Sequence, residues 1–108
     1  MSRSHLAHRT DASHAEIVQA FAQLGCTVFS SHAVGAGFPD LVVGCNGCTL
    51  LVEIKTERGE LTKAQREFIT AWNGDTIHIV CDTDDVIALV NRTRARNTRQ
   101  LLTQMRQI

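Results

Sequence analysis

The dipeptide Asn46-Gly47 lies between two runs of β-prone residues, "PDLVVGC" and "CTLLVEIK". Both of its positions tolerate positive φ, which a two-residue type I′ turn requires, so the sequence predicts a β-hairpin. Counting outward from this turn along an antiparallel ladder brings Asp40 opposite Glu53. The count makes them a non-hydrogen-bonded pair, in which Cα atoms lie within about 4.5 Å.

Lys55 follows Glu53 by two residues, so the alternation of a strand puts both side chains on one face of the sheet. Two opposed carboxylates on a half-buried sheet repel each other unless a cation, a shared proton or a nearby base offsets their charge. Oxygen ligands of this kind suit Mg²⁺, and a metal with an adjacent lysine suits phosphodiester hydrolysis. The alternative is an ordinary ion pair between Glu53 and Lys55, with Asp40 as a simple turn acid.

The remaining pattern predicts an α/β fold in the order α-β-β-β-α-β-α. Ser13 and Glu16 form a possible capping box, and Thr62 is the expected N-cap of a second helix. The expected elements are a helix over 13–25, strands over 26–32, 39–45 and 48–55, a helix over 61–72, a strand over 76–81 and a helix over 82–93. We expect Phe68 and Trp72 to pack in the core, and no aromatic-basic interleaving predicts a platform for stacking single-stranded bases.

A length of 108 residues predicts one domain, 1–108, with its core over about 14–90 and a basic segment over 91–108. The last 17 residues hold five arginines and no acid, and the first 91 hold 6 basic and 11 acidic side chains. A basic tail on an acidic body suggests a polyanionic partner, although it also fits a solvated helix end. No run is apolar enough for a membrane span or a signal peptide, so we expect a cytoplasmic location, in a bacterial or phage-infected cell, and reduced cysteines.

The residues "PD" at 39–40 and "EIK" at 53–55 resemble the signature of the PD-(D/E)xK nuclease superfamily. The wider stretch "GFPDLVVG…LLVEIKTERGELTKAQREF" is similar to its VRR-NUC branch, and the resemblance covers about residues 14–90. It implies a restriction-endonuclease-like core, a mixed β-sheet flanked by helices, with a divalent-metal nuclease site.

Carried over to this chain, the resemblance implies that Asp40 and Glu53 bind the metal and that Lys55 is the catalytic lysine. Gln65, on the following helix, matches a glutamine that supports the site. Glu16 matches an acid that many relatives place near the metal, but the capping box gives it an alternative role. The segment between Gln65 and the strand at 76 is short for the family, which leaves contacts at the end of that helix open.

Other residues offer weaker signals. His32, Arg58 and Lys63 are candidates for contacts to DNA phosphates, with solvated surface charge as the alternative. The spacing Cys45-x-x-Cys48 occurs in zinc sites, but the chain has no second CxxC or HxxxH motif. We therefore expect the two cysteines to pack as small apolar side chains.

Taken together, the sequence predicts an endonuclease that depends on Mg²⁺ or Mn²⁺, with no small-molecule cofactor. The resemblance implies branched DNA as substrate, of the four-way-junction or flap type. A homodimer would supply two active sites, with the C-terminal segment or the first helix as the contact. Two alternatives are a non-catalytic nucleic-acid-binding domain on the same fold and a restriction-type duplex endonuclease. The sequence leaves the process open: repair, recombination or phage genome processing.

Overall fold

The computed structural model describes residues 12–55 and 59–107. The elements follow the order predicted from the sequence, with one short 3-10 helix added after the first strand. They are α1 (His14–Gln23), β1 (Thr27–Ser30), η2 (His32–Val34), β2 (Leu41–Cys45), β3 (Cys48–Ile54), α2 (Lys63–Ala71), β4 (His78–Val80) and α3 (Thr83–Arg106). The α/β fold class is therefore confirmed.

The four strands form one mixed sheet in the order β1-β2-β3-β4. β2 is antiparallel to both β1 and β3, whereas β4 runs parallel to β3. Asn46 and Gly47 have φ values of 50° and 82°, as a type I′ turn requires. Cys45 pairs with Cys48 and Leu41 with Val52, so the predicted hairpin register is confirmed.

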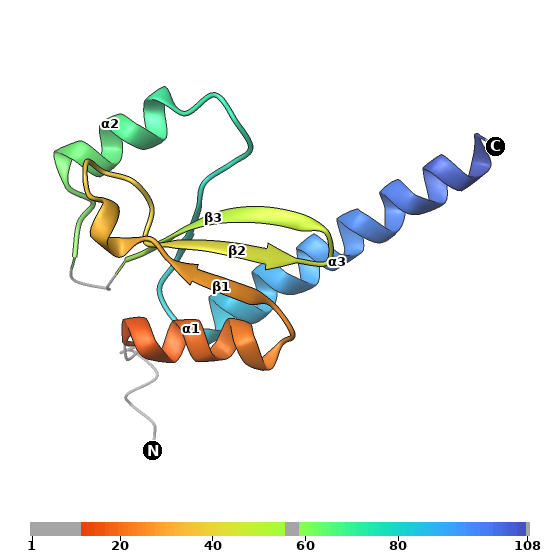
Figure 1. The fold of residues 1–108 in the computed structure, drawn as a ribbon, viewed down its shortest axis with the longest axis horizontal. Helices are drawn as coiled ribbons and strands as arrows, with labels where there is room; N and C mark the ends of the chain where they lie inside the picture. The colour runs from red at the N-terminus through yellow and green to blue at the C-terminus, as the bar shows by residue number, and fades with distance from the viewer. Residues whose placement is uncertain (1–11, 56–58, 108) are drawn as a thin grey trace, which may run out of the picture.

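One face of the sheet carries the core. Figure 1 shows α1 and α3 side by side against this face, with α2 on the opposite side of the sheet. Alternate residues of the strands point toward α1 and α3, as the period of two in a strand dictates. The fully buried members of this core are Ile17, Phe21, Leu41, Val43, Val52, Val86 and Val90.

Helix α2 does not contribute to this core. None of its residues is buried, and Trp72, which caps its end, is 42% exposed. Phe68 is half-buried, and it stacks on Trp72 and meets Phe38 edge to face. The expectation that Trp72 packs in the core is thus wrong, because helical spacing marks an apolar side without fixing the surface that it meets.

Helix α3 is one continuous helix of 24 residues, and it includes most of the segment expected to be separate. Its first half packs in the core, and its second half projects away from the body (Figure 1). Arg94 donates to the Leu24 carbonyl, and Asn97 donates to the Asn46 carbonyl at 2.7 Å, which fixes the middle of the helix. In the described part of the chain, no helix has both the length and the apolar character needed to cross a membrane.

Gly37 allows the loop before β2 to touch the start of α2. Its φ is +81°, and a Cβ at this position would lie 2.3 Å from the Ala64 carbonyl oxygen. Both the positive φ and the backbone contact exclude a larger residue. This contact sets the first turn of α2 against the segment that carries Asp40.

A pair of glycine substitutions tests this contact. Gly47→Ala introduces only the strain of a positive φ, since nothing lies within 4 Å of the added Cβ, and we expect a loss of about 1–2 kcal/mol. Gly37→Ala adds a collision with the backbone of α2, so we expect a clearly larger loss. Urea unfolding measures both, and equal losses would contradict the proposed role of this contact.

Candidate active site

Asp40 lies directly before β2, in a segment held by backbone contacts. The Asp40 carbonyl accepts a hydrogen bond from the Ser31 amide at 2.8 Å, and the Ser31 hydroxyl donates to the Pro39 carbonyl at 2.7 Å. Pro39 and Ser31 are both buried. The position of the Asp40 side chain is therefore fixed by its neighbours on both strands.

The Asp40 carboxylate reaches across to β3. Its Oδ2 accepts from the Ile54 amide at 2.8 Å, and its Oδ1 lies 3.2 Å from Nδ1 of His32. In a regular ladder the Ile54 amide would face the carbonyl of Pro39. Because the Asp40 side chain takes this amide instead, its carboxylate is tied to the residue next to Glu53.

Glu53 carries the second carboxylate, and it is only 2% exposed. Gln65 donates to Oε2 of Glu53 from Nε2 at 2.6 Å. The same glutamine accepts from the Thr62 amide at 2.7 Å, within a capping box at the start of α2. These two hydrogen bonds fix the orientation of the Gln65 side-chain amide, which links the helix cap to the buried acid.

The two carboxylates interact strongly. Burial raises the pKa of Glu53 to about 8, and the neighbouring charge and hydrogen bond of Asp40 act in the same direction. Without a cation, the pair is thus stable when Glu53 keeps its proton and shares it with Asp40. A divalent ion offsets the same repulsion, and carboxylate oxygens are ligands that Mg²⁺ and Mn²⁺ accept. The donor set therefore fits a hard divalent cation.

Lys55 follows the end of β3 and stays aligned with the sheet, because its amide donates to the Val80 carbonyl at 2.9 Å. It is half-buried, and strand alternation places it on the same face as Glu53. Among the residues that the structure describes, its ammonium group has no hydrogen bond or ion pair. The group is therefore available to a ligand at the carboxylates.

Glu16 serves the helix cap. Its Oε1 accepts from the Ser13 amide at 2.8 Å, while the Ser13 hydroxyl accepts from the Glu16 amide at 3.1 Å. The hydrogen bond to the Ser13 backbone lowers the pKa of this exposed carboxyl group. Within residues 12–55 and 59–107, no three histidine, cysteine or acidic side chains form a ready metal site, so the structure does not gather Glu16 with Asp40 and Glu53. A metal-binding role for Glu16 stays a prediction.

Two of the three predicted phosphate contacts, His32 and Lys63, fall within the described residues. His32 is exposed beside Asp40. Lys63 is exposed in the first turn of α2, with its Nζ 4.0 Å from Oε2 of Glu67. Arg58 lies outside the described residues. His14, which the sequence did not single out, lies beside His32. The two ring centroids are 6.0 Å apart, and Nε2 of His14 is 3.3 Å from the Ser30 hydroxyl. No local sequence pattern predicts this neighbour, because only the packing of α1 beside η2 brings the two rings together.

Three of the four cysteines, Cys26, Cys45 and Cys48, lie in or against the core. None of the four forms a disulfide, and Cys45 faces Cys48 across the hairpin as predicted. Burial raises the pKa of Cys26 to about 11, with a further contribution from Cys45. The Cys26 thiol therefore stays protonated and acts as a small apolar group at neutral pH.

Substitution of the buried acid gives a prediction with a defined sign. The pKa of Glu53 lies above its ordinary value of 4.5, so its protonation stabilises the fold fully below about pH 4.5 and this stabilisation is lost as the pH rises through about 8. Glu53→Gln keeps a hydrogen-bonding side chain without the charge. In EDTA at pH 9 we therefore expect this variant to be more stable than the wild type by roughly 1–3 kcal/mol, with a smaller difference at pH 5.

Urea unfolding at the two pH values measures this difference. Glu67→Gln is the control, since it removes an exposed carboxylate, and it should show no such change between pH 5 and pH 9. A Glu53→Gln protein that is equally destabilised at both pH values would contradict the description of the carboxylate pair.

Comparison with known proteins gives a family. Neither the curated proteins nor the solved structures contain a match to this chain. A family model described as archaeal Holliday junction resolvase (Hjc) matches residues 7–72, a span that includes α1, the whole hairpin, the carboxylate pair and α2. The match covers more than half of the chain, so the protein belongs to the archaeal Holliday junction resolvase family, a nuclease family of the PD-(D/E)xK type.

Proposed function

We propose that this protein is an endonuclease that uses Mg²⁺ or Mn²⁺ to hydrolyse phosphodiester bonds in branched DNA, with the four-way junction as its principal substrate. The observation that carries the proposal is the interaction of the half-buried Asp40 with the buried Glu53, with Lys55 placed on the same face by strand alternation. The family supports the nuclease activity and the branched substrate. The motif order, with "LTKAQ" after the pair, favours a VRR-NUC-like variant in which residues 1–108 act as one domain.

Each residue has a role in the proposed reaction. Asp40 and Glu53 would hold the divalent ion, which would supply Lewis-acid chemistry for the hydrolysis of the phosphate. Gln65 keeps the Glu53 carboxylate in place through its 2.6 Å hydrogen bond. Lys55 would stabilise negative charge that develops on the phosphate, since strand alternation puts its side chain on the same face as Glu53.

A matched set of variants tests this assignment. We expect Asp40→Asn and Lys55→Ala each to reduce cleavage of a four-way junction by about 10²-fold or more, because each removes a group that acts on the reacting phosphate. Asp84→Asn is the control, since this exposed acid lies in the first turn of α3, outside the proposed site. Cleavage of labelled junction, flap and linear duplex DNA with Mg²⁺, Mn²⁺ or EDTA provides the measurement.

The result separates the function classes. Cleavage of branched substrates alone, lost in EDTA and in Asp40→Asn, supports the proposal. Binding of junctions without cleavage in either metal would favour a non-catalytic binding domain on the same fold. Cleavage of linear duplex at fixed sequences would favour a restriction-type enzyme.

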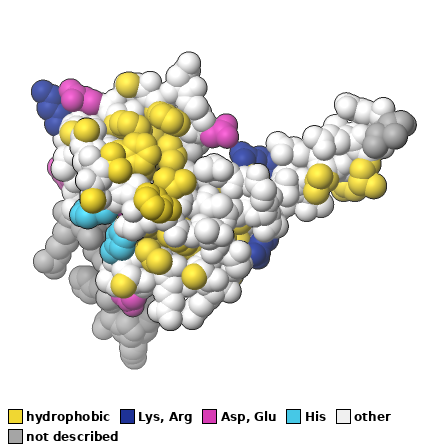
Figure 2. All heavy atoms as spheres, in the orientation of Figure 1, with side chains coloured by type: hydrophobic (Ala, Val, Ile, Leu, Met, Phe, Trp, Pro, Cys, Tyr) yellow, Lys and Arg dark blue, Asp and Glu magenta, His cyan; other side chains and the backbone are white. Residues whose placement is uncertain are grey.

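We also propose that the protein acts as a homodimer through the projecting half of α3. Leu101, Leu102 and Met105 are 52%, 49% and 66% exposed, and Figure 2 shows hydrophobic side chains near the end of this helix. Arg92, Arg96 and Arg99 recur at helical spacing on the other side. One side of the helix is thus suited to a second copy and the other to phosphates, and a two-fold dimer matches a junction cut in two strands.

Light scattering after gel filtration tests the dimer. We expect the wild-type chain to have twice its monomer mass and the double variant Leu101→Glu, Met105→Glu to have the monomer mass, because two charges at the apolar contact oppose association. Gln104→Glu adds one charge to an exposed polar position of the same helix and should remain dimeric. A wild-type protein that is monomeric at tens of micromolar would contradict this contact.

A further inference from the structure

A cavity of about 400 Å³ lies along residues 49–51 of β3, between the segment after α2 and helix α3. We call it the Trp72 pocket. Its walls come from the loop before β2, from β3, from the segment after α2 and from α3, and they include Phe38, Leu51, Trp72, Asp75 and Arg96. The volume falls in the range of roughly 300–1,000 Å³ that is typical of ligand sites. No residue of the proposed reaction lines it.

Two residues of the pocket wall lie close in the sequence to the two acids. Leu51 precedes Glu53 by two residues on β3, and Phe38 precedes Asp40 by two residues. Strand alternation therefore puts Leu51 and Glu53 on the same face of the sheet, which is the face away from α1 and α3. Two strand residues span about 7 Å and stacked bases are about 3.4 Å apart, so the pocket lies within one or two nucleotides of a phosphate bound at the acids.

The indole of Trp72 is held in a fixed position although it is exposed. Its Nε1 donates to the Asp75 carbonyl at 3.0 Å, and its ring stacks on Phe68 with centroids 5.5 Å apart and planes 18° from parallel. Gly74 makes room for the ring, because a Cβ there would lie 2.7 Å from Nε1 of the indole. The protein thus presents a large apolar plane to the pocket without lost side-chain entropy on binding.

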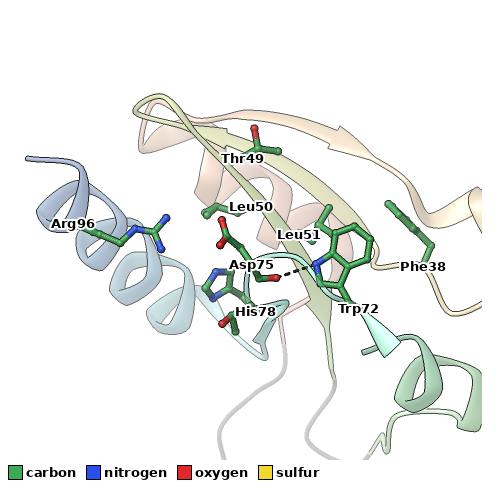
Figure 3. Close-up of a pocket in the computed structure, with 9 residues that line it drawn as sticks. Phe38, Thr49, Leu50, Leu51, Trp72, Asp75, His78 and Arg96 are labelled. Atoms are coloured by element: carbon green, nitrogen blue, oxygen red, sulfur yellow. Dashed lines mark hydrogen bonds between the residues drawn. The ribbon is translucent and has the colours of Figure 1, made fainter. Parts of the chain in front are cut away.

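Polar groups line the end of the pocket opposite the indole. Figure 3 shows Arg96 reaching in from α3 toward Asp75 and His78, with Leu51 and Phe38 close to Trp72. Burial and the nearby Arg92 and Arg96 lower the pKa of His78, so its ring is neutral at pH 7. The wall therefore combines guanidinium donors with the carboxylate acceptor of Asp75. A phosphate would be repelled by Asp75, whereas the edge of a nucleobase carries both donors and acceptors.

We propose that the Trp72 pocket binds one unpaired nucleobase of the DNA strand whose phosphate lies at Asp40 and Glu53. This inference rests on the proposed function and adds a source of substrate choice to it. The base stacks on the indole and places its polar edge toward Arg96 and Asp75. Removing a base from a duplex costs a few kcal/mol, and the cost is least where the base is already unpaired or unstacked. The pocket would therefore favour DNA at a branch point over a continuous duplex.

Intrinsic fluorescence reports on this pocket alone, because the chain has one tryptophan and no tyrosine. In EDTA, so that no cleavage occurs, we titrate the protein with a short single-stranded oligonucleotide and with an abasic strand of the same length. We expect the bases to quench the indole and the abasic strand to leave it unchanged at equal occupancy, which fluorescence anisotropy of an end label establishes. Equal fluorescence with both strands would overturn the proposal.

Variants give an independent measurement. We expect Trp72→Ala to weaken oligonucleotide binding about tenfold or more, and Trp72→Phe to retain most of the affinity, because base stacking needs an aromatic plane. Gly74→Ala should weaken binding by displacing the indole. Phe29→Ala is the matched control, since Phe29 is an exposed aromatic residue of β1 that does not line the pocket. Circular dichroism establishes that each variant is folded, and an unchanged affinity in Trp72→Ala would contradict the proposal.

Further outcomes distinguish DNA from a free nucleotide as the ligand, and failure of the pocket proposal from failure of the nuclease proposal. A nucleoside monophosphate that quenches the indole at the same concentration as the oligonucleotide would overturn the DNA assignment in favour of a free nucleotide. If junctions are cleaved but Trp72→Ala keeps the wild-type ratio of junction to duplex cleavage, the pocket proposal fails and the proposed function stands. If bases quench the indole but no DNA is cleaved, the pocket stands and the nuclease proposal fails.

Discussion

The opposition of Asp40 and Glu53 is the constraint on which the rest of the site depends. The hairpin register, which pairs Leu41 with Val52, directs these two residues toward each other. Glu53 is almost fully buried, so water screens its charge little. The protein compensates in part with the Ile54 amide at Asp40 and the Gln65 amide at Glu53. The remaining repulsion between the two carboxylates still has to be offset by positive charge. In the chain alone a proton on Glu53 offsets it, and a divalent ion is suited to do the same.

Helix α2 connects this constraint to the rest of the surface. It has no buried residue, so its position depends on a few contacts: the hydrogen bond from Gln65 to Glu53, the close approach of Gly37 to Ala64, and the aromatic cluster of Phe68 with its neighbours. The start of the helix supports the buried acid, and its end carries the indole of the Trp72 pocket. The carboxylate site and the pocket therefore share one supporting element, and a ligand in one would stabilise the geometry of the other.

Much of this architecture follows from local chemistry. The Asn46-Gly47 turn requires positive φ at both residues, and it sets the register that opposes Asp40 and Glu53. The capping box of Ser13 and Glu16, the N-cap at Thr62 and the order of elements were predicted for the same reason, since each depends on residues close together in the sequence. Gln65 was expected near the site, but its double role as helix cap and donor to Glu53 needed the packing of α2 against the sheet.

The sequence by itself determined the hairpin, its register and hence the convergence of two acids and a lysine, because turn geometry and strand alternation are local rules. The tertiary structure alone decided which surfaces meet: it left Trp72 on the outer face of the sheet, joined the basic segment to α3, placed His14 beside His32, and kept Glu16 in a helix cap. Helical periodicity identifies the apolar side of a helix but not the surface against which that side packs. The free energy of burying the side depends on the shape and polarity of a surface formed by residues distant in the sequence.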